Sequence, residues 1–335
     1  MIPSPDDDWA IAGGCLYTGL RDLSADPHAL DTSGRWIVVQ TFEGALVCAR
    51  FATATQYDGE PAAGKGWEPV RAPWTSSLDK DGYVDAVKKV RARIAAGDVY
   101  QVNVCRLLAA EADAVPDLFA LGAALARGNP APYAATVNLP SANLYVASAS
   151  PELFLRRDRD TVVSGPIKGT ARTPDGLTGK DRAENVMIVD LVRNDLGRVA
   201  VTGSVDVPDL LVTERHPGLV HLVSRIRARL ASGIGWAELL AATAPAGSIT
   251  GAPKSSALRI IGELEPVPRG VYCGGVGWVD ADNQRGELAV AIRTFEWSAG
   301  RLLLGTGAGI TWGSDPRREW EETELKVSRL IGAVT

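Results

Sequence analysis

The sequence has few cysteines and no long apolar segment. Its four cysteines, Cys15, Cys48, Cys105 and Cys273, lie far apart and form no C-x-x-C pair. This spacing indicates reduced core thiols rather than a disulfide framework or a zinc site. No apolar run approaches the length of a membrane span, and the amino-terminal residues lack the basic start and apolar stretch of a secretory signal. We therefore expect a cytoplasmic protein with no membrane partner.

An excess of charge of one sign is also missing. The formal net charge of the 335 residues is -5, from 35 basic and 40 acidic side chains, and neither a basic run nor an acidic tail is present. The charge pattern therefore favours no nucleic-acid partner, and a small anionic ligand would need a local basic pocket. Apolar residues make up 46% of the chain, which is enough to build a large core.

Hydrophobic periodicity predicts a mixture of helices and strands. Helical spacing occurs over residues 83–96, 181–196 and 316–332, and strand-like runs occur over 36–39, 45–48, 99–104, 135–139 and 144–147. Glycine-rich turns are expected between strands from Gly247 to Gly309. Since no repeat or low-complexity linker divides the chain, we expect one α+β unit in which two facing β-sheets, flanked by helices, share a central cleft. Residues 1–75 would be a short strand-rich region packed on a catalytic core of residues 76–335.

Two of the predicted helices carry paired carboxylates. Asp181 and Glu184 are three residues apart, and so are Glu319 and Glu322, with Lys326 one turn further on. This spacing places the side chains of each pair next to one another on one helix face. If both faces point into one cleft, their carboxylates could hold a hard cation such as Mg²⁺, which prefers oxygen ligands. Both could equally be solvated faces with local salt bridges.

The glycine-rich segments do not match nucleotide-binding loops. In Gly247–Lys254, Ala252 and Pro253 separate the last glycine from the lysine that a Walker motif needs next to it, and Gly305–Gly309 lacks the spacing of a dinucleotide fingerprint. Both could cradle a carboxylate through backbone N–H groups, or be ordinary tight turns.

A lysine between turn-forming residues is a candidate nucleophile. Lys168 lies in the segment Ser164-Gly165-Pro166-Ile167-Lys168-Gly169-Thr170, outside any amphipathic pattern. Such a lysine can act as a nucleophile when burial or a nearby cation lowers its pKa, and Glu152 could protonate a leaving hydroxyl group. A Lys168–Glu152 ion pair is the structural alternative.

Together these segments resemble the chorismate-utilising enzymes, the family of anthranilate, aminodeoxychorismate, isochorismate and salicylate synthases. The resemblance extends from about residue 80 to the end of the chain. It includes the segments 97–103, 166–170, 181–185, 188–195, 221–224, 247–254 and 319–323. The number and order of these matches favour the functional interpretation of each segment over the structural one.

The resemblance implies a set of site residues around Mg²⁺ and the carboxylates of chorismate. Glu184 and Glu322 would lead the metal site, with Asp181 and Glu319 nearby, directly or through water. The residues implied in substrate binding are Thr250, Gly251, Ala252, Tyr272, Arg293, Gly307, Gly309 and Lys326. His221 corresponds to the family's histidine close to the substrate ring, although a lone histidine on a helix could also be a core residue.

Two residues indicate which reaction of the family to expect. The members that activate water carry a lysine base where this chain has Gln101, and a glutamine cannot take a proton from water at neutral pH. Lysine at position 168 is typical of aminodeoxychorismate synthases, whereas anthranilate synthases usually have alanine there. The resemblance therefore implies amination of chorismate through a covalent lysine adduct, for 4-aminobenzoate and folate synthesis or a related pathway.

The resemblance also implies a partner, because the family's ammonia normally comes from a separate glutamine amidotransferase subunit. The alternatives are an anthranilate or aminodeoxyisochorismate synthase, and a chorismate-binding subunit without catalytic activity. Family members usually have a longer amino-terminal portion with a tryptophan-binding pocket, and this chain has no counterpart of its tryptophan motif.

Overall fold

Six α-helices flank the strands in the part of the chain that the structure describes. The structure is a computed structural model that describes residues 3–57, 59, 67–171, 173–216 and 219–335. The α-helices in this part are α1 (Lys80–Ala95), α2 (Leu118–Gly128), α3 (Gly179–Gly197), α4 (Trp236–Thr243), α5 (Lys254–Leu264) and α6 (Pro316–Val334). Short 3-10 helices lie at η1 (Pro27–Asp31), η2 (Pro140–Ala142), η3 (Pro174–Gly176) and η4 (Gly247–Ile249).

The strands pair antiparallel throughout the described part of the chain. The amino-terminal half contains β1 (Trp9–Ala12), β2 (Cys15–Ser24), β3 (Arg35–Gln40), β4 (Leu46–Gln56), β5 (Thr75–Ser76), β6 (Gln101–Glu111), β7 (Tyr133–Leu139), β8 (Leu144–Ser150), β9 (Leu153–Asp158) and β10 (Thr161–Gly165). The remaining strands are β11 (Ile167–Ala171), β12 (Asp206–His216), β13 (Leu219–Arg229), β14 (Gly251–Ala252), β15 (Gly275–Asp280), β16 (Arg285–Val290), β17 (Thr294–Ser298) and β18 (Arg301–Ile310).

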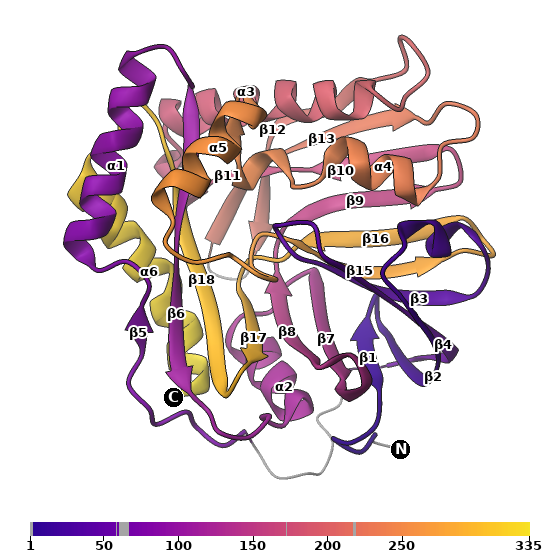
Figure 1. The fold of residues 1–335 in the computed structure, drawn as a ribbon. Coiled ribbons are helices and arrows are strands. Elements are labelled where there is room, and N and C mark those ends of the chain that lie inside the picture. Colours follow the sequence, from indigo (N-terminus) through magenta and orange to yellow (C-terminus); the bar gives the residue numbers. More distant parts are fainter. Residues whose placement is uncertain (1–2, 58, 60–66, 172, 217–218) are drawn as a thin grey trace.

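Hydrogen bonds join these strands into one ladder. Beginning at β6, the order is β6, β18, β17, β8, β7, β1, β2, β4, β3, β15, β16, β9, β10, β13 and β12. The short strands β5 and β14 also pair with β6, and β11 pairs with β13. The strands from β6 to β7 run across the direction of β9, β15 and β16, so the ladder turns to form two layers (Figure 1). The predicted α+β class is confirmed, and the two expected sheets are the two halves of this ladder.

The amino-terminal strands lie in the middle of the ladder. Strand β1 pairs with β7, and β3 pairs with β15, so residues before 75 are hydrogen-bonded directly to later parts of the chain. The domain boundary near residue 75 stays a prediction. No helix in the described ranges is both long and apolar enough to cross a membrane.

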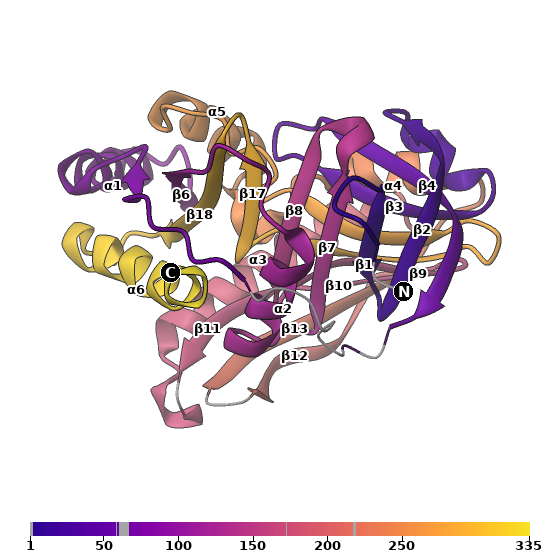
Figure 2. The ribbon, with the colours of Figure 1, turned by 90° about the horizontal axis from the view of Figure 1, so that it is seen from below.

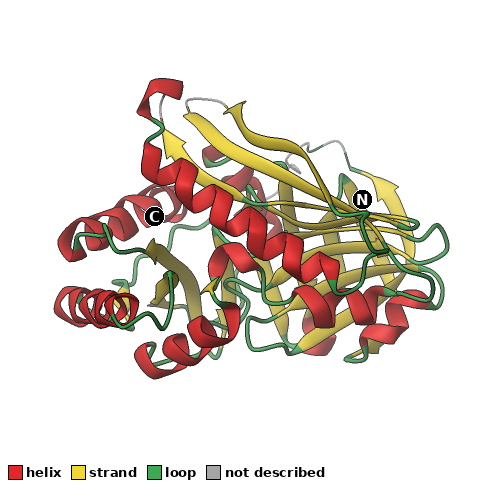
Figure 3. Cartoon of the chain, turned by 90° about the horizontal axis from the view of Figure 1, so that it is seen from above, coloured by secondary structure: helices red, strands yellow, loops and turns green. Residues whose placement is uncertain are grey.

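The helices with paired carboxylates cover different parts of the ladder. Helix α6 lies beside α1, next to β6 and β18 (Figure 2). Helix α3 packs on β13, and the view from above shows it lying across the strands (Figure 3). Its buried face carries Ile188, Val192 and Leu196, which share a hydrophobic cluster with Ile226 of β13. The predicted helical spacing of both segments is therefore confirmed.

Two local expectations were wrong. Gly305–Gly309 was expected to be a turn, but it lies within β18 and pairs with β6 along its whole length. Glycine is needed there because a side chain at Gly305 would overlap the ring of Tyr272. His221 was considered as a helix residue, but it lies on β13, between Thr170 of β11 and Glu214 of β12.

Candidate active site

The candidate nucleophile and the candidate acid both contact Ser248. Lys168, on β11, donates a hydrogen bond from Nζ to the carbonyl oxygen of Ser248 over 2.8 Å. Glu152, between β8 and β9, is buried and hydrogen-bonds to the side chain of Ser248. Among the described residues, Lys168 and Glu152 do not approach closely enough to form an ion pair. Ser248 therefore bridges the two groups, and the simple ion-pair interpretation is wrong.

The surroundings favour the uncharged forms of both groups. Burial lowers the pKa of Lys168, although the carboxylates of Glu184 and Glu152 oppose this shift. Burial likewise raises the pKa of Glu152, opposed by the hydrogen bond from Ser248 and by the charge of Lys168. A lysine amine becomes a nucleophile when it loses its proton, and a carboxyl group can act as an acid only while protonated. The direction of both shifts therefore suits the roles predicted for them.

A fully buried glutamine lies next to this pair. Gln101 begins β6, and neither its Oε1 nor its Nε2 has a hydrogen-bond partner among the described residues. A methyl group at Gly309 would overlap Gln101 Nε2 and would lie 3.7 Å from Lys168 Nζ. The absence of a side chain at Gly309 therefore leaves room for both Gln101 and Lys168. An unpaired buried amide costs free energy unless a ligand or water bonds to it. Gln101 is therefore available to bind a polar group beside Lys168.

The four predicted carboxylates lie on two helices, α3 and α6, which are joined by the ion pairs of one lysine. Lys180 Nζ is 3.3 Å from Glu319 Oε1, across from α3 to α6, and 3.6 Å from Glu184 Oε1. Glu322 Oε1 is 2.8 Å from Lys326 Nζ. Asp181 is bound differently, because its Oδ2 accepts hydrogen bonds from the backbone and hydroxyl of Thr178 and so caps α3.

The charges around these carboxylates oppose one another. Burial raises the pKa of Glu184, and Glu319 and Asp181 raise it further, whereas Lys168 and Lys180 lower it. For Glu322, burial is outweighed by the ammonium group of Lys326, so its pKa is lowered. The arrangement is thus a group of acids held together by lysine charges.

The donor set is chemically suited to Mg²⁺, without forming a complete cage. Within the described ranges, no three His, Cys, Asp or Glu side chains are grouped closely enough to hold a metal ion by themselves. Glu184 Oε1, however, is buried without a hydrogen-bond partner. Mg²⁺ is usually held by one or two carboxylates and keeps several waters. Oxygen ligands from Glu184 and its neighbours fit that requirement.

The predicted carboxylate-binding residues fall into two groups. Thr250, Gly251 and Ala252 lie beside the start of β6. The carbonyl oxygen of Thr250 accepts a hydrogen bond from Asn103 N–H of β6, and that of Ala252 accepts one from Tyr100 N–H just before β6, over 2.7 Å each. Lys326 of α6 and Gly307 of β18 form the second group, in which Lys326 Nζ donates to the Gly307 carbonyl over 2.9 Å. Gly309, which adjoins Gln101 and Lys168, is two residues from Gly307 on β18.

Of three further predicted residues, Tyr272 and His221 are buried and Arg293 is half-buried. Tyr272 is buried and packs its ring against Gly305 of β18. Gln101 adjoins Gly309, which lies four residues later on the same strand. Arg293 has a positive φ of 53°, and burial lowers the pKa of its guanidinium group although Glu152 raises it. His221 is buried on β13.

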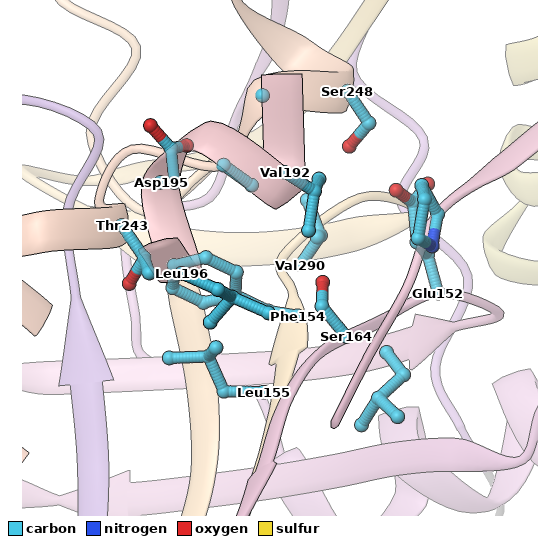
Figure 4. Close-up of a pocket in the computed structure, with 14 residues that line it drawn as sticks. Glu152, Phe154, Leu155, Ser164, Val192, Asp195, Leu196, Thr243, Ser248 and Val290 are labelled. Atoms are coloured by element: carbon cyan, nitrogen blue, oxygen red, sulfur yellow. The ribbon is translucent and has the colours of Figure 1, made fainter. Parts of the chain in front are cut away.

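The cavity beside Glu152 is too small for an aromatic substrate. Its volume is about 10 Å³, and Glu152, Ser164, Ser248 and Asp195 are among its lining residues (Figure 4). That is enough for about one water molecule, whereas ligand pockets have volumes of roughly 300–1,000 Å³. A much larger cavity of about 730 Å³ lies between β1, β7, α2 and β15, and no predicted site residue lines it.

Several residues that support the site were not among those predicted from the sequence. Ser248 lies in the predicted carboxylate-binding segment but was not distinguished from its neighbours. Lys180 precedes Glu184 by one helical turn, a spacing that could have indicated their ion pair. Lys254, at the start of α5, binds Asp195 at the end of α3 over 2.5 Å. In the sequence, Lys254 and Asp195 were interpreted only as members of the family segments 247–254 and 188–195.

Comparison with known proteins gives consistent results. The chain matches the family described as chorismate binding enzyme over residues 39–332. It is 35% identical to aminodeoxychorismate synthase component 1 of Salmonella typhimurium, over 98% of this chain and 78% of that protein. It is 38% identical to an anthranilate synthase component 1 of Haloarcula marismortui, over 88% of this chain and 64% of that protein. Its fold is similar to that of anthranilate synthase component I from Streptococcus pneumoniae, with a TM-score of 0.79 and 23% identity over 98% of this chain and 91% of that one.

Proposed function

The chain belongs to the chorismate-binding enzyme family, and within it we propose that the chain is an aminodeoxychorismate synthase component I. It would convert chorismate and ammonia to 4-amino-4-deoxychorismate and retain the enolpyruvyl group. The proposal rests on the contact of Lys168 and Glu152 with one residue, Ser248, which supports a nucleophile and an acid acting together.

In the proposed first step, Lys168 attacks the substrate while a hydroxyl group leaves. The neutral amine of Lys168 adds to ring carbon 2, the double bond shifts, and the hydroxyl leaves carbon 4 with a proton from Glu152, as water. The lowered pKa of Lys168 and the raised pKa of Glu152 support these protonation states. The hydrogen bond from Lys168 Nζ to the Ser248 carbonyl would direct the lone pair of the amine away from that oxygen.

In the second step, ammonia attacks carbon 4 and the lysine leaves carbon 2. The incoming ammonia loses one proton, which restores Glu152 to its acid form, so the overall change exchanges a hydroxyl for an amino group. Gln101 supports ammonia as the nucleophile, because its buried amide can bind a small polar molecule but cannot remove a proton from water. The ammonia would come from a glutamine amidotransferase subunit.

Glu184 and Glu322 would hold Mg²⁺, with Asp181 and Glu319 nearby, directly or through water. Bound Mg²⁺ would anchor the ring carboxylate of chorismate and draw electron density toward it, a Lewis-acid effect worth several kcal/mol in general. Arg293 and Lys326 would bind substrate carboxylates, with backbone groups of Thr250, Gly251, Ala252, Gly307 and Gly309, while Tyr272 and His221 would line the pocket.

Product analysis tests the proposal. The purified chain would be incubated with chorismate, Mg²⁺ and ammonium at mildly alkaline pH, where free ammonia can replace the partner's supply. We expect a product with the mass of chorismate minus water plus ammonia, and no pyruvate. Lys168→Ala should lose most of this product while still binding chorismate, and a fully active variant would contradict the covalent step.

The second candidate is an anthranilate synthase component I, favoured by the 38% identity to the Haloarcula marismortui protein. The same assay separates the two functions, since anthranilate forms only with release of pyruvate. Anthranilate together with an equal amount of pyruvate would overturn the proposed reaction and leave the family assignment intact.

A further inference from the structure

Three lysines lie in the site, namely Lys168, Lys180 and Lys326. Of these three, only Lys180 forms ion pairs with two of the proposed metal ligands. It lies in the first turn of α3, and its Nζ approaches Glu184 of the same helix at 3.6 Å and Glu319 of α6 at 3.3 Å. Its ammonium group thus joins α3 and α6. No other ion pair joins the two helices in the described part of the chain.

The carboxylates that Lys180 contacts need a positive charge close by. Glu319 is only 4% exposed, and Glu184 Oε1 is buried without a hydrogen-bond partner. Two carboxylates in a buried site repel one another and have lost part of their hydration. A nearby cation or a bound proton offsets both costs. The ammonium group of Lys180 supplies one positive charge between them. A divalent cation bound to the same oxygens would supply two.

The contacts of Lys180 also leave it free to move away. Its side chain is 46% exposed and reaches the carboxylates on a flexible four-carbon stem. The other two site lysines are held by backbone carbonyls: Lys168 by Ser248 over 2.8 Å, and Lys326 by Gly307 over 2.9 Å. The hydrogen bonds of Lys180 include no such carbonyl, so it can turn toward solvent without leaving a buried backbone oxygen unpaired.

We propose that Lys180 is an internal counter-ion that competes with Mg²⁺ for Glu184 and Glu319. Binding of the metal would displace the ammonium group into solvent, and release of the metal would bring it back. The competition would weaken the apparent affinity for Mg²⁺ while preventing repulsion between α3 and α6 when the metal is absent. This inference rests on the proposed magnesium role of the carboxylates, but not on which product the enzyme makes.

Calorimetric titration with Mg²⁺, without chorismate, tests the competition. Lys180→Met removes the ammonium group and retains most of the stem, and we expect its Mg²⁺ affinity to rise roughly two- to fivefold, the range for losing a partly exposed ion pair. Lys180→Arg keeps the charge and should bind Mg²⁺ about as the unchanged protein does. The matched control is Arg182→Met, which removes an exposed positive charge two residues along the same helix and should change the affinity little.

Thermal unfolding gives a second measurement that does not depend on activity. In the presence of EDTA, Lys180→Met should unfold at a lower temperature than Arg182→Met, because Glu184 and Glu319 then lack a counter-charge. Saturating Mg²⁺ should remove most of that difference. Lys180→Gln would give the same comparison if Lys180→Met were recovered in poor yield.

The outcomes separate this inference from the proposals on which it rests. Equal or weaker Mg²⁺ affinity in Lys180→Met, with normal binding in the unchanged protein, would overturn the competition and leave the metal site intact. An equal gain in Arg182→Met would also overturn it, since the effect would then be one of overall charge. If no variant bound Mg²⁺, both the competition and the metal role would be wrong, whereas the product assay would still decide the reaction.

Discussion

The ion pair between Lys254 and Asp195 allows a prediction with a defined magnitude. Lys254 donates from Nζ to Asp195 Oδ2 over 2.5 Å and to the carbonyl oxygens of Thr243 and Pro245 over 2.9 Å each. All three ammonium protons are therefore used, and Asp195 is 4% exposed. The pair fastens the ends of α3 and α4 to the start of α5, and so supports the segment that carries Ser248.

Lys254→Met would leave a buried carboxylate and two carbonyls without their donor. Breaking a buried ion pair by removing one partner typically costs about 3–5 kcal/mol, and we expect a loss of stability in this range near pH 8. Burial already raises the pKa of Asp195 while Lys254 opposes it, so the pKa should rise further in the variant. A raised pKa in the folded state means that the folded variant binds a proton which the unfolded chain releases. The loss of stability should therefore be smaller at pH 5.5 than at pH 8.

Urea unfolding at both pH values measures this effect. Lys89→Met is the matched control, because it removes the partner of exposed Asp85 on α1 and should leave the urea midpoint unchanged. Removing both charges, in Lys254→Met with Asp195→Leu, should recover more than half of the loss, since no buried charge is then left alone. A loss below about 1 kcal/mol that did not change with pH would refute the reasoning.

Three further predictions concern the site itself. Glu322→Gln should weaken Mg²⁺ binding and lower turnover together, as calorimetry and product formation would show, whereas a loss of partner binding alone would contradict the metal role. Gly309→Ala should lower kcat/KM on the order of a hundredfold, because its methyl group would displace Gln101 beside Lys168; unchanged kinetics would mean that Gln101 is not needed there. Because burial lowers the pKa of Lys168, its acylation by a lysine reagent, followed by mass spectrometry, should reach half its maximal rate at a lower pH than that of the free model compound Nα-acetyl-lysine amide. The same midpoint for both would contradict the burial effect.

The sequence predicted the parts of the site that depend on local spacing. Helical periodicity placed Glu184 on α3 and Glu322 on α6, and the turn-forming residues around Lys168 indicated a lysine with a special environment. The two helix placements succeeded because side-chain direction along a helix follows from residue spacing alone, whereas Lys168 lies on strand β11 rather than in a turn. The family resemblance then related segments that are far apart in the chain.

The contacts between distant segments could not be predicted from spacing. The pairing of β18 with β6 decides that Gly305–Gly309 is extended, and that pairing depends on residues about 200 positions earlier in the chain. Lys180 lies one turn before Glu184, so their pairing was open to prediction, but its contact with Glu319 required the relative placement of α3 and α6. Ser248 acquires its role only because β11 and the segment before β9 meet at the same loop.

The three site lysines differ in what holds them, and this difference separates their proposed roles. A dianionic substrate such as chorismate is attracted by every lysine in the site, so charge alone cannot make one a nucleophile and another a binding group. The Ser248 carbonyl holds Lys168, and burial favours loss of its proton by lowering its pKa, although the nearby carboxylates oppose this shift. The Gly307 carbonyl and Glu322 hold Lys326, and Glu322 stabilises its positive charge. Lys180 is held by carboxylates, and a stronger cation can therefore replace it.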